Sequence, residues 1–445
     1  MSPFASATCA FGMLVGFALV STARQTRHPR HRRTDDEFST SFLSEHERLA
    51  VIRRAAPDIA KYLPLSFDPS FDSPCFKDAK GAMQCLPAFF IAGGMQCGSD
   101  VLWQRLMSHG HIGRQHDGRS HWWTLHPRSR AGTFERYLSL FSNERTLATL
   151  QREPRTLLGE VSPATFAFMM AEMLRLHYLY LDAFSACHGR CRSRNPPPEH
   201  AALCARKTYD LAHCYVAANN ATVPEEFNVP SLISTVLAAR PPRVVALLRE
   251  PSLRLWVAFW EYGQYPARYG RSNAGFAYYF GNQSAAFERC VATDGRGRRR
   301  CALRFEAYGA AEAGVYYHAD QLVKGMYAAF LPEWQASLPR DHLLVMRSED
   351  QVARPMHVLR RVASHLGLRP FTQSELHAAR AANAADELEK VKSAHGLPEA
   401  AVLANVRAFY APFNRALARQ LGDRAFTWRR VAMGESTQSS TGRLE

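Results

Sequence analysis

The sequence predicts an α/β fold in which a central parallel sheet is flanked by helices. Short apolar segments alternate with longer amphipathic ones, the pattern of parallel strands connected by helices. Four segments have the length and composition of buried strands: Ala88–Ala92, Thr156–Glu160, Arg243–Leu248 and His342–Met346. Because ligands bind beyond the carboxyl ends of parallel strands, the residues that follow these segments are the first candidates for a functional site.

Helices are expected between and after these strands. Their apolar residues recur at helical spacing, and several begin at Ser, Asp or Pro. The expected helical segments are Glu45–Ala56, a run that starts at Val101, Thr165–Ala183, Ser252–Tyr262, Ala274–Cys290, Ala313–Leu331, a helix ending at Leu366, and Asn405–Leu421.

The chain divides by composition into four parts. Residues 1–23 are apolar and have the length of a membrane span or signal anchor. Residues 24–74 form a polar, basic stem, and residues 75–430 form the globular domain, with a Cys-rich insertion at 187–224. Residues 431–445 are a polar tail.

The charge balance favours an anionic partner. The 445 residues carry a formal net charge of +15, which suits an anionic cofactor, an acidic polysaccharide or a membrane surface. Zinc-finger spacing and RNP motifs are absent from the sequence, so nucleic acid is not the expected partner.

Two observations on compartment disagree. The apolar segment Pro3–Ala23 is either a membrane span or a signal peptide cut near Ala23. Arg24 begins a basic stretch through Arg33, which would favour a cytosolic C-terminal side. Cysteine usage instead favours an oxidising lumen, and we adopt the lumenal interpretation, with the chain crossing the membrane once.

The lumenal interpretation predicts disulfides and glycans. Of ten cysteines, Cys9 lies in the leader and Cys97 in a glycine turn, which leaves eight, an even number. Cys75 would pair with Cys85 and Cys290 with Cys301, and the other four would pair among themselves, although their spacing is also compatible with zinc: Cys187, Cys191, Cys204 and Cys214. Asn220 and Asn282 begin glycosylation sequons.

A glycine-bearing turn follows the first strand. It spans Gly93–Gly98, and Ser99-Asp100 then signals the start of a helix. A turn of this kind directs backbone N–H groups at an anion near a helix N-terminus, although a simple tight strand–helix turn has the same pattern. The Walker Lys does not precede Ser99, so an ordinary NTPase is not expected.

Seven segments, in order and at compatible spacing, resemble the carbohydrate sulfotransferases, closest to the N-acetylgalactosamine 4-sulfate 6-O-sulfotransferase branch. The resemblance covers roughly Cys75 to Trp428. The segments are Gly93–Asp100, HWWT at His121–Thr124, GEVSP at Gly159–Pro163, LLREP at Leu247–Pro251, GVYY at Gly314–Tyr317, LLVMRSED at Leu343–Asp350 and the closing segment Phe409–Trp428.

The resemblance implies a P-loop-like fold and transfer of a sulfuryl group from 3′-phosphoadenosine 5′-phosphosulfate (PAPS) to a sugar hydroxyl in the Golgi lumen, with no metal. The acceptor would be an anionic polysaccharide or other glycan. Arg249 would bind the 3′-phosphate. The remaining donor-binding positions would be Gly94, Gln96, Cys97, Gly98, Ser99 and Asp100.

Three positions depart from the family pattern. The family's loop Lys is replaced by Gln96, its general-base Glu by Arg119, and a phosphate-binding Ser by Val257. Gln96 can still donate a hydrogen bond, Arg119 can supply positive charge, and His121 can serve as the base. The sequence therefore leaves open an active enzyme, a degenerate homologue that binds glycan or nucleotide without turnover, and a structural membrane-anchored protein.

Other residues have two interpretations each. Trp122 and Trp123 stack on a sugar ring or pack in the core. Glu160 and Ser162 contact the substrate and orient the site, or they cap a strand end. Arg347 and Glu349 are expected to form an ion pair behind the sheet, and Cys97 to be a free, partly buried thiol rather than a nucleophile.

Overall fold

The computed structural model describes most of the globular part of the chain. The described residues are 43–113, 120–124, 132–168, 175–180, 182–183, 212, 214, 216–219, 223–224, 226–292, 297–304, 320–382 and 386–429. The expected apolar leader 1–23 and tail 431–445 lie outside them. Across the described residues, no helix is long and apolar enough to cross a bilayer.

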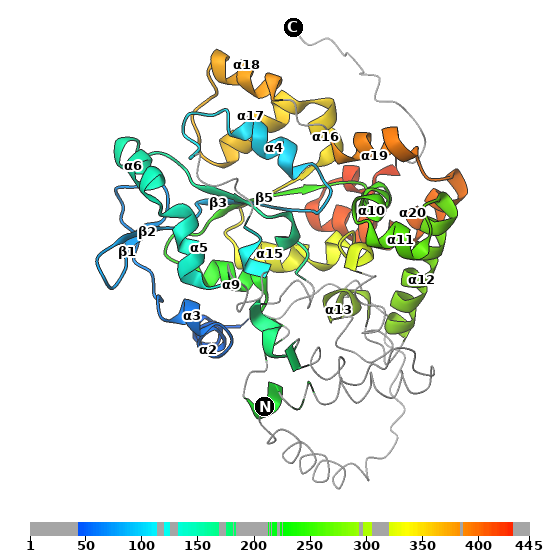
Figure 1. Cartoon of the computed structure of the whole chain (residues 1–445), viewed down its shortest axis with the longest axis horizontal. Coiled ribbons are helices and arrows are strands. Elements are labelled where there is room, and N and C mark those ends of the chain that lie inside the picture. The colour runs from blue at the N-terminus through cyan, green and yellow to red at the C-terminus, as the bar shows by residue number, and fades with distance from the viewer. Residues whose placement is uncertain are drawn as a thin grey trace.

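A four-stranded parallel sheet forms the centre of the molecule (Figure 1). Its order is β4 (Gly159–Val161), β3 (Phe89–Gly93), β5 (Arg243–Leu248) and β6 (Leu343–Arg347). All three neighbouring pairs are parallel. The predicted fold class is therefore confirmed, and each expected strand lies within three residues of its predicted bounds.

Both faces of the sheet are buried because successive side chains point to opposite sides. In β3, Phe89 and Ile91 face one core cluster, while Phe90 and Ala92 face the other. The first cluster includes apolar side chains of α4 (Ser99–Leu106) and α17 (Pro355–His365). Strands covered on both faces read as continuous apolar runs, which is why these segments were recognisable in the sequence.

Helices cover the sheet on both sides (Figure 1). With α4 and α17, one side carries α16 (Ser348–Ala353) and α18 (Gln373–Ala381). The remaining helices are α2 (Glu45–Ala55), α3 (Pro57–Ala60), α5 (Phe134–Phe141), α6 (Glu144–Arg152), α9 (Val229–Val236), α10 (Pro251–Glu261), α11 (Gln264–Tyr269), α12 (Asn273–Ala292), α13 (Gly297–Arg304), α15 (Leu331–Ser337), α19 (Glu387–His395) and α20 (Ala400–Leu421), with short 3-10 turns η2 (Trp122–Thr124), η3 (Pro163–Thr165), η6 (Tyr327–Ala329) and η7 (Arg424–Thr427).

Four expected helices differ from the structure. The helix expected to run to Leu366 is divided into α16 and α17, because Pro355 disfavours helical backbone at Arg354, whose φ is −140°. The helix expected at 165–183 begins as the turn η3. Of the one expected at 313–331, residues 313–319 lie outside the described residues, residues 320–323 are helical, and a turn and η6 then replace the helix. The last helix, α20, begins at Ala400, five residues before the expected start at Asn405.

The folded domain begins before Cys75, so the expected stem boundary at residue 74 is wrong. Val51 and Ile52 on α2 and Ile59 on α3 are fully or almost fully buried in the main core. A capping box between Ser44 and Glu47 starts α2. The apolar residues of this segment recur at helical spacing, and that spacing outweighs its polar composition.

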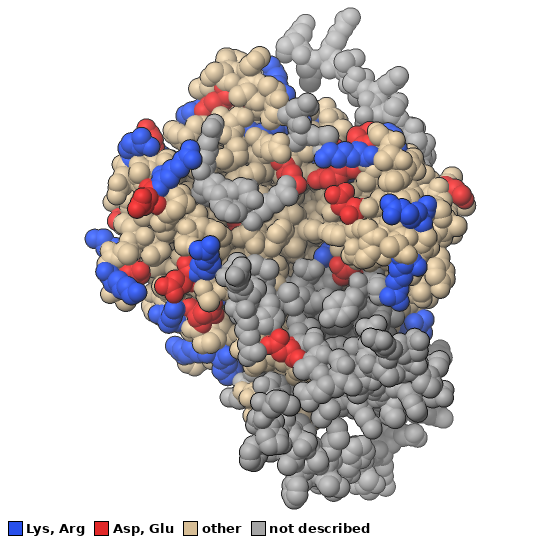
Figure 2. Space-filling model, in the orientation of Figure 1, with Lys and Arg blue, Asp and Glu red and all other residues tan. Residues whose placement is uncertain are grey.

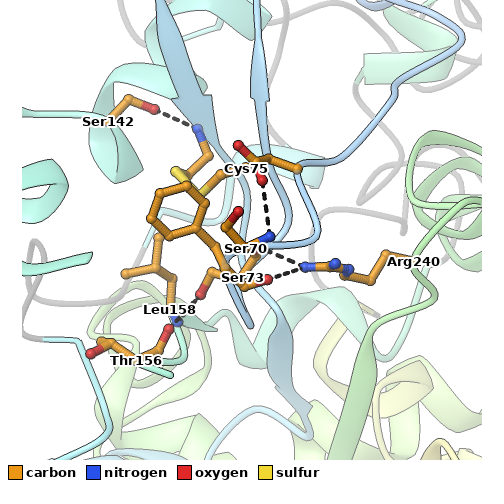
Figure 3. The surroundings of a disulfide bond; sticks show 10 residues. Ser70, Ser73, Cys75, Ser142, Thr156, Leu158 and Arg240 are labelled. Atoms are coloured by element: carbon orange, nitrogen blue, oxygen red, sulfur yellow. Dashed lines mark hydrogen bonds between the residues drawn. A yellow bond between two sulfur atoms is a disulfide. The ribbon is translucent and has the colours of Figure 1, made fainter. Parts of the chain in front are cut away.

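One predicted disulfide joins the two strands of a hairpin (Figure 3). Cys75 in β1 (Cys75–Lys77) lies opposite Cys85 in β2 (Met83–Cys85), with 4.0 Å between their Cα atoms. Beside it, the Ser73 hydroxyl donates to the Thr156 carbonyl at 2.9 Å and accepts from the Leu158 amide at 2.8 Å. These bonds attach the hairpin to the segment that leads into β4.

The second predicted bridge, Cys290–Cys301, is also formed, and it links α12 to α13. Cys214 instead carries a free thiol and is half-buried. The expectation that it pairs within the group of four is therefore wrong, because an even count does not bring sulfur atoms within the short Cα separation that a bridge needs. Cys187, Cys191 and Cys204 lie outside the described residues.

We expect native alkylation to distinguish the two free thiols among the described residues. Cys97 is buried and burial raises its pKa to about 11, so its unreactive thiol form predominates at neutral pH. Iodoacetamide at pH 8, followed by non-reducing digestion and mass spectrometry, should label Cys214 and spare Cys97. Equal labelling of both, or free thiols at the Cys75–Cys85 or Cys290–Cys301 pairs, would contradict the structure.

Candidate functional site

The glycine turn after β3 lies beside the end of β5. The Gly94 amide donates to the Leu247 carbonyl at 2.9 Å, which joins the two strand ends. Along the chain, β4 is added on one side of β3 and β5 on the other, so strand order reverses between β3 and β5. Crevices at such a reversal are the usual ligand sites of open parallel sheets.

The turn enters α4 through Gly98, whose φ of +80° favours glycine. Two side chains of α16 hold this turn in place. Ser348 Oγ donates to the Cys97 carbonyl, and Gln351 Nε2 donates to the Gly98 carbonyl at 2.9 Å. The position at which α4 begins, with the Ser99 amide first, is therefore fixed by three elements: β3, β5 and α16.

Arg249 lies directly over this turn. Its side chain is 2% exposed and forms a bidentate pair with Asp386, at 2.8 Å and 2.6 Å. Glu387 Oε2 lies 3.5 Å from the same guanidinium. A Cβ atom built on Gly98 would lie 3.3 Å from Asp386 Oδ2 and 3.7 Å from Arg249 Nη2, so the ion pair contacts the glycine turn itself.

The residues of this turn fit an anionic ligand. Buried atoms that can donate a hydrogen bond but have no partner occur on two of the predicted donor-binding residues: Ser99 Oγ and Arg249 Nε. Unsatisfied buried polar atoms are costly, and a ligand is one way to satisfy them. Figure 2 shows acidic side chains gathered where α4, α10 and α19 meet. Of the carboxylates on α19 and its N-cap, Glu387 and Asp386 lie within ion-pair distance of Arg249.

Gln96 lies at the same turn with a φ of +56°. Its Nε2 lies 3.5 Å from the hydroxyl of Tyr262. Tyr262 is the C-cap residue of α10. A left-handed backbone is uncommon for a residue with a side chain. The neighbouring Asp100 lies half-buried in the first turn of α4. The structure thus places Gln96 in the glycine turn, in contact with the C-cap residue of the helix that follows Arg249.

His121 is held by a buried hydrogen-bond network at the end of β4. Its amide donates to Ser162 Oγ at 3.0 Å, and Ser162 Oγ in turn donates to Glu160 Oε1 at 2.5 Å. Ser120 Oγ donates to the same carboxylate oxygen at 2.7 Å, and the Tyr137 hydroxyl donates to Glu160 Oε2. Burial raises the pKa of Glu160, which these hydrogen bonds oppose.

This network decides the roles left open for Glu160 and Ser162. Both side chains are at most 1% exposed and their oxygens are already hydrogen-bonded within the network, so the assignment of both to substrate binding is wrong. They orient the segment Ser120–His121 instead. Arg119, the residue at the family's general-base position, lies outside the described residues.

Trp122 and Trp123 pack in the core, so their assignment to substrate binding is also wrong. They are 1% and 0% exposed. The Trp122 ring stacks on Tyr137 with centroids 4.5 Å apart, and the guanidinium of Arg175 lies 3.4 Å from its centre. Burying these two large aromatic rings beside Tyr137 stabilises the fold more than leaving them exposed to solvent would.

Two further positions are structural. Val257 is fully buried in the core on α10, so the position of the family's Ser carries an apolar side chain packed against its neighbours. The expected Arg347–Glu349 ion pair is not formed. Arg347 pairs with Asp350 at 2.8 Å, while Glu349 accepts from the Glu250 amide and from Trp428 Nε1.

The sequence interpretation missed Asp386 and Glu387. Asp386 is the N-cap of α19, a role that Asp commonly has and that its position before a helical run could have indicated. Its pairing with a residue 137 positions earlier had no local signal. The predicted sequon residue Asn282 lies exposed on α12, while Asn220 lies outside the described residues, and both stay predictions.

Fold and site together have the features of an enzyme or binding protein for a phosphate-bearing donor, and the chain is similar to carbohydrate sulfotransferases. Carbohydrate sulfotransferase 15 of Homo sapiens is 24% identical over 359 residues, a match that covers 78% of this chain and 55% of that protein. The protein of the same name in Mus musculus is 22% identical over 366 residues, with the same coverage. The predicted resemblance is thereby confirmed, and the chain spans about half the length of these relatives.

The chain was also compared with family models and with solved structures. No family model matches the chain. Among solved structures, a sulfotransferase from Alicyclobacillus acidocaldarius aligns with a TM-score of 0.38 and 16% identity, covering 78% of this chain and 99% of that chain.

Substitution of Glu160 by Ala should lower the free energy of unfolding by about 3 kcal/mol, because three hydroxyl donors, two of them buried, would lose their acceptor. Urea denaturation measures this loss. The control Gln151→Ala, at an exposed position of α6, should change stability by less than about 0.5 kcal/mol. Equal stability of the two variants would show that the network does not support the site.

Proposed function

We propose that the chain is a sulfotransferase that transfers a sulfuryl group from PAPS to a sugar hydroxyl of a glycosaminoglycan-like or other polysaccharide. The single observation that supports this most is the buried Arg249 guanidinium over the Gly98 turn, at the N-terminus of α4. A fixed, fork-shaped cation beside helix amides is suited to phosphate and sulfate groups. The similarity to carbohydrate sulfotransferases favours PAPS among phosphate-bearing donors.

In this proposal the turn residues 94–100 hold the 5′-phosphosulfate with backbone amides, and Arg249 holds the 3′-phosphate. PAPS supplies an activated sulfuryl group, whose bond to the bridging phosphate oxygen breaks as the acceptor hydroxyl oxygen bonds to sulfur. His121 accepts the hydroxyl proton. Gln96 donates a hydrogen bond toward the leaving oxygen, and Arg119 supplies positive charge nearby.

The alternative is a degenerate homologue that binds nucleotide or glycan without turnover. The observation that favours it is local: Gln96 replaces the family's Lys, and Val257 is packed in the core. We further propose a Golgi membrane location with the domain in the lumen, supported by two disulfides formed between the predicted partners. The apolar leader would be the anchor.

We expect Arg249→Ala to weaken binding of 3′-phosphoadenosine 5′-phosphate (PAP) by about 1.5–3 kcal/mol, the scale of a charge-assisted contact. Isothermal titration calorimetry measures the change. Because the substitution also leaves Asp386 without its partner, the double variant Arg249→Ala/Asp386→Ala serves as the control for misfolding. Unchanged PAP affinity in a folded variant would remove this assignment.

Asp386→Asn should raise the affinity for PAP about fivefold to tenfold. The carboxylate lies where a phosphate would meet Arg249, so the ligand has to displace it. Asn keeps the helix N-cap. Glu389→Gln, an exposed position on the same helix, is the matched control and should leave affinity unchanged. Weaker binding by Asp386→Asn would mean that Asp386 positions Arg249 and does not compete.

Sulfate transfer from radiolabelled PAPS tests the activity itself, on chondroitin 4-sulfate and a panel of other polysaccharides. Gln96→Lys should raise turnover, because an ammonium near the leaving oxygen is worth roughly 2–4 kcal/mol. Combining it with Arg119→Glu should exceed the sum of the two single changes, since neighbouring site residues couple. An active wild type harmed by Gln96→Lys would contradict these roles, and PAP binding without transfer by any variant would favour the degenerate homologue.

A further inference from the structure

A basic groove lies along α20 and η7, outside the candidate site. It consists of two adjoining hollows with volumes of about 420 Å³ and 260 Å³. They share Arg415, Thr427 and Arg429. Together the two hollows contain five lining arginines, which we call the groove arginines: Arg407, Arg415, Arg419, Arg424 and Arg429.

The groove arginines form a line rather than a point. Arg407, Arg415 and Arg419 are separated by multiples of four residues on α20, so they lie along one side of the helix. At 1.5 Å per residue this stripe is about 18 Å long. Arg424 and Arg429 add charge from η7 and the residue that follows Trp428. An extended anionic chain matches a linear stripe better than a small anion does.

In the described part of the chain, one carboxylate neutralises this stripe only in part. Glu250 is the one acidic residue among the described lining residues. Its side chain is buried and accepts from the Ser252 and Leu253 amides as the N-cap of α10. Arg407 Nε is buried without a hydrogen-bond partner. Glu250 nevertheless interacts electrostatically with Arg407, whereas the other four groove arginines form no ion pair with a described carboxylate, so the groove keeps a positive charge.

We propose that the groove arginines bind a linear sulfated polysaccharide, at a site separate from the transfer site. Guanidinium groups bind sulfate and carboxylate oxygens in a bidentate manner. Single-stranded nucleic acid is less well matched, because its binding relies on exposed aromatic rings. Trp428, the one aromatic residue among the described lining residues, is 3% exposed.

One end of the groove lies near the candidate site. Glu250 lines its inner end and directly follows Arg249 in the chain. A polysaccharide bound along α20 therefore extends from the neighbourhood of the β5 carboxyl end. Binding of a polysaccharide in the groove does not depend on sulfuryl transfer. The proposal therefore also applies if the chain is a homologue without turnover.

The test measures binding of fluorescent chondroitin 4-sulfate to the full chain by thermophoresis at several salt concentrations. Arg415→Gln/Arg419→Gln removes two exposed charges while keeping helix-forming residues. Arg136→Gln/Arg145→Gln removes two exposed charges on α5 and α6 and is the matched control. We expect at least a tenfold loss and a shallower salt dependence for the groove variant, and less than a twofold loss for the control.

Three results would overturn the proposal: no binding by the wild type, equal losses in both double variants, or tighter binding of single-stranded RNA that is lost only in the groove variant. Circular dichroism checks that each variant is folded. Arg424→Gln/Arg429→Gln, which changes no residue of α20, repeats the test if the first variant does not fold.

Discussion

The candidate site depends on one buried cation. Arg249 lies at the end of β5 with its side chain almost fully buried, and a buried guanidinium needs anionic partners. In the structure these are Asp386 and Glu387, brought from the start of α19. The same pair contacts the Gly98 turn, so β5, α4 and α19 meet at this single interaction.

The surrounding contacts keep this arrangement rigid. The Tyr327 hydroxyl donates to the Arg249 carbonyl at 2.9 Å, while Ser348 and Gln351 hold the two carbonyls of the glycine turn. On the other side of β3, Glu160 organises the segment that carries His121. The two halves of the site are thus built on β4 and β5, the two strands that flank β3, and this is an arrangement that a preorganised donor and acceptor site needs.

The sequence was most informative where the signal is local. The strands are continuous apolar runs because both faces of the sheet are buried, and the glycine turn is marked by Gly98 and the helix start after it. Arg249 followed from its place at a strand end. Pairings at long range had no such signal. The Arg249–Asp386 pair and the burial of Trp122 depend on which elements pack together, and residue type alone does not specify that.

Calorimetric titration of the folded chain with PAP, compared with adenosine 5′-monophosphate, tests the central claim most directly. If Arg249 and the Gly98 turn form a site for the donor, PAP should bind with micromolar affinity. Adenosine 5′-monophosphate, which lacks the 3′-phosphate that Arg249 would hold, should bind at least tenfold more weakly. Equal affinities for the two nucleotides, or no heat of binding with PAP, would contradict the assignment of this site.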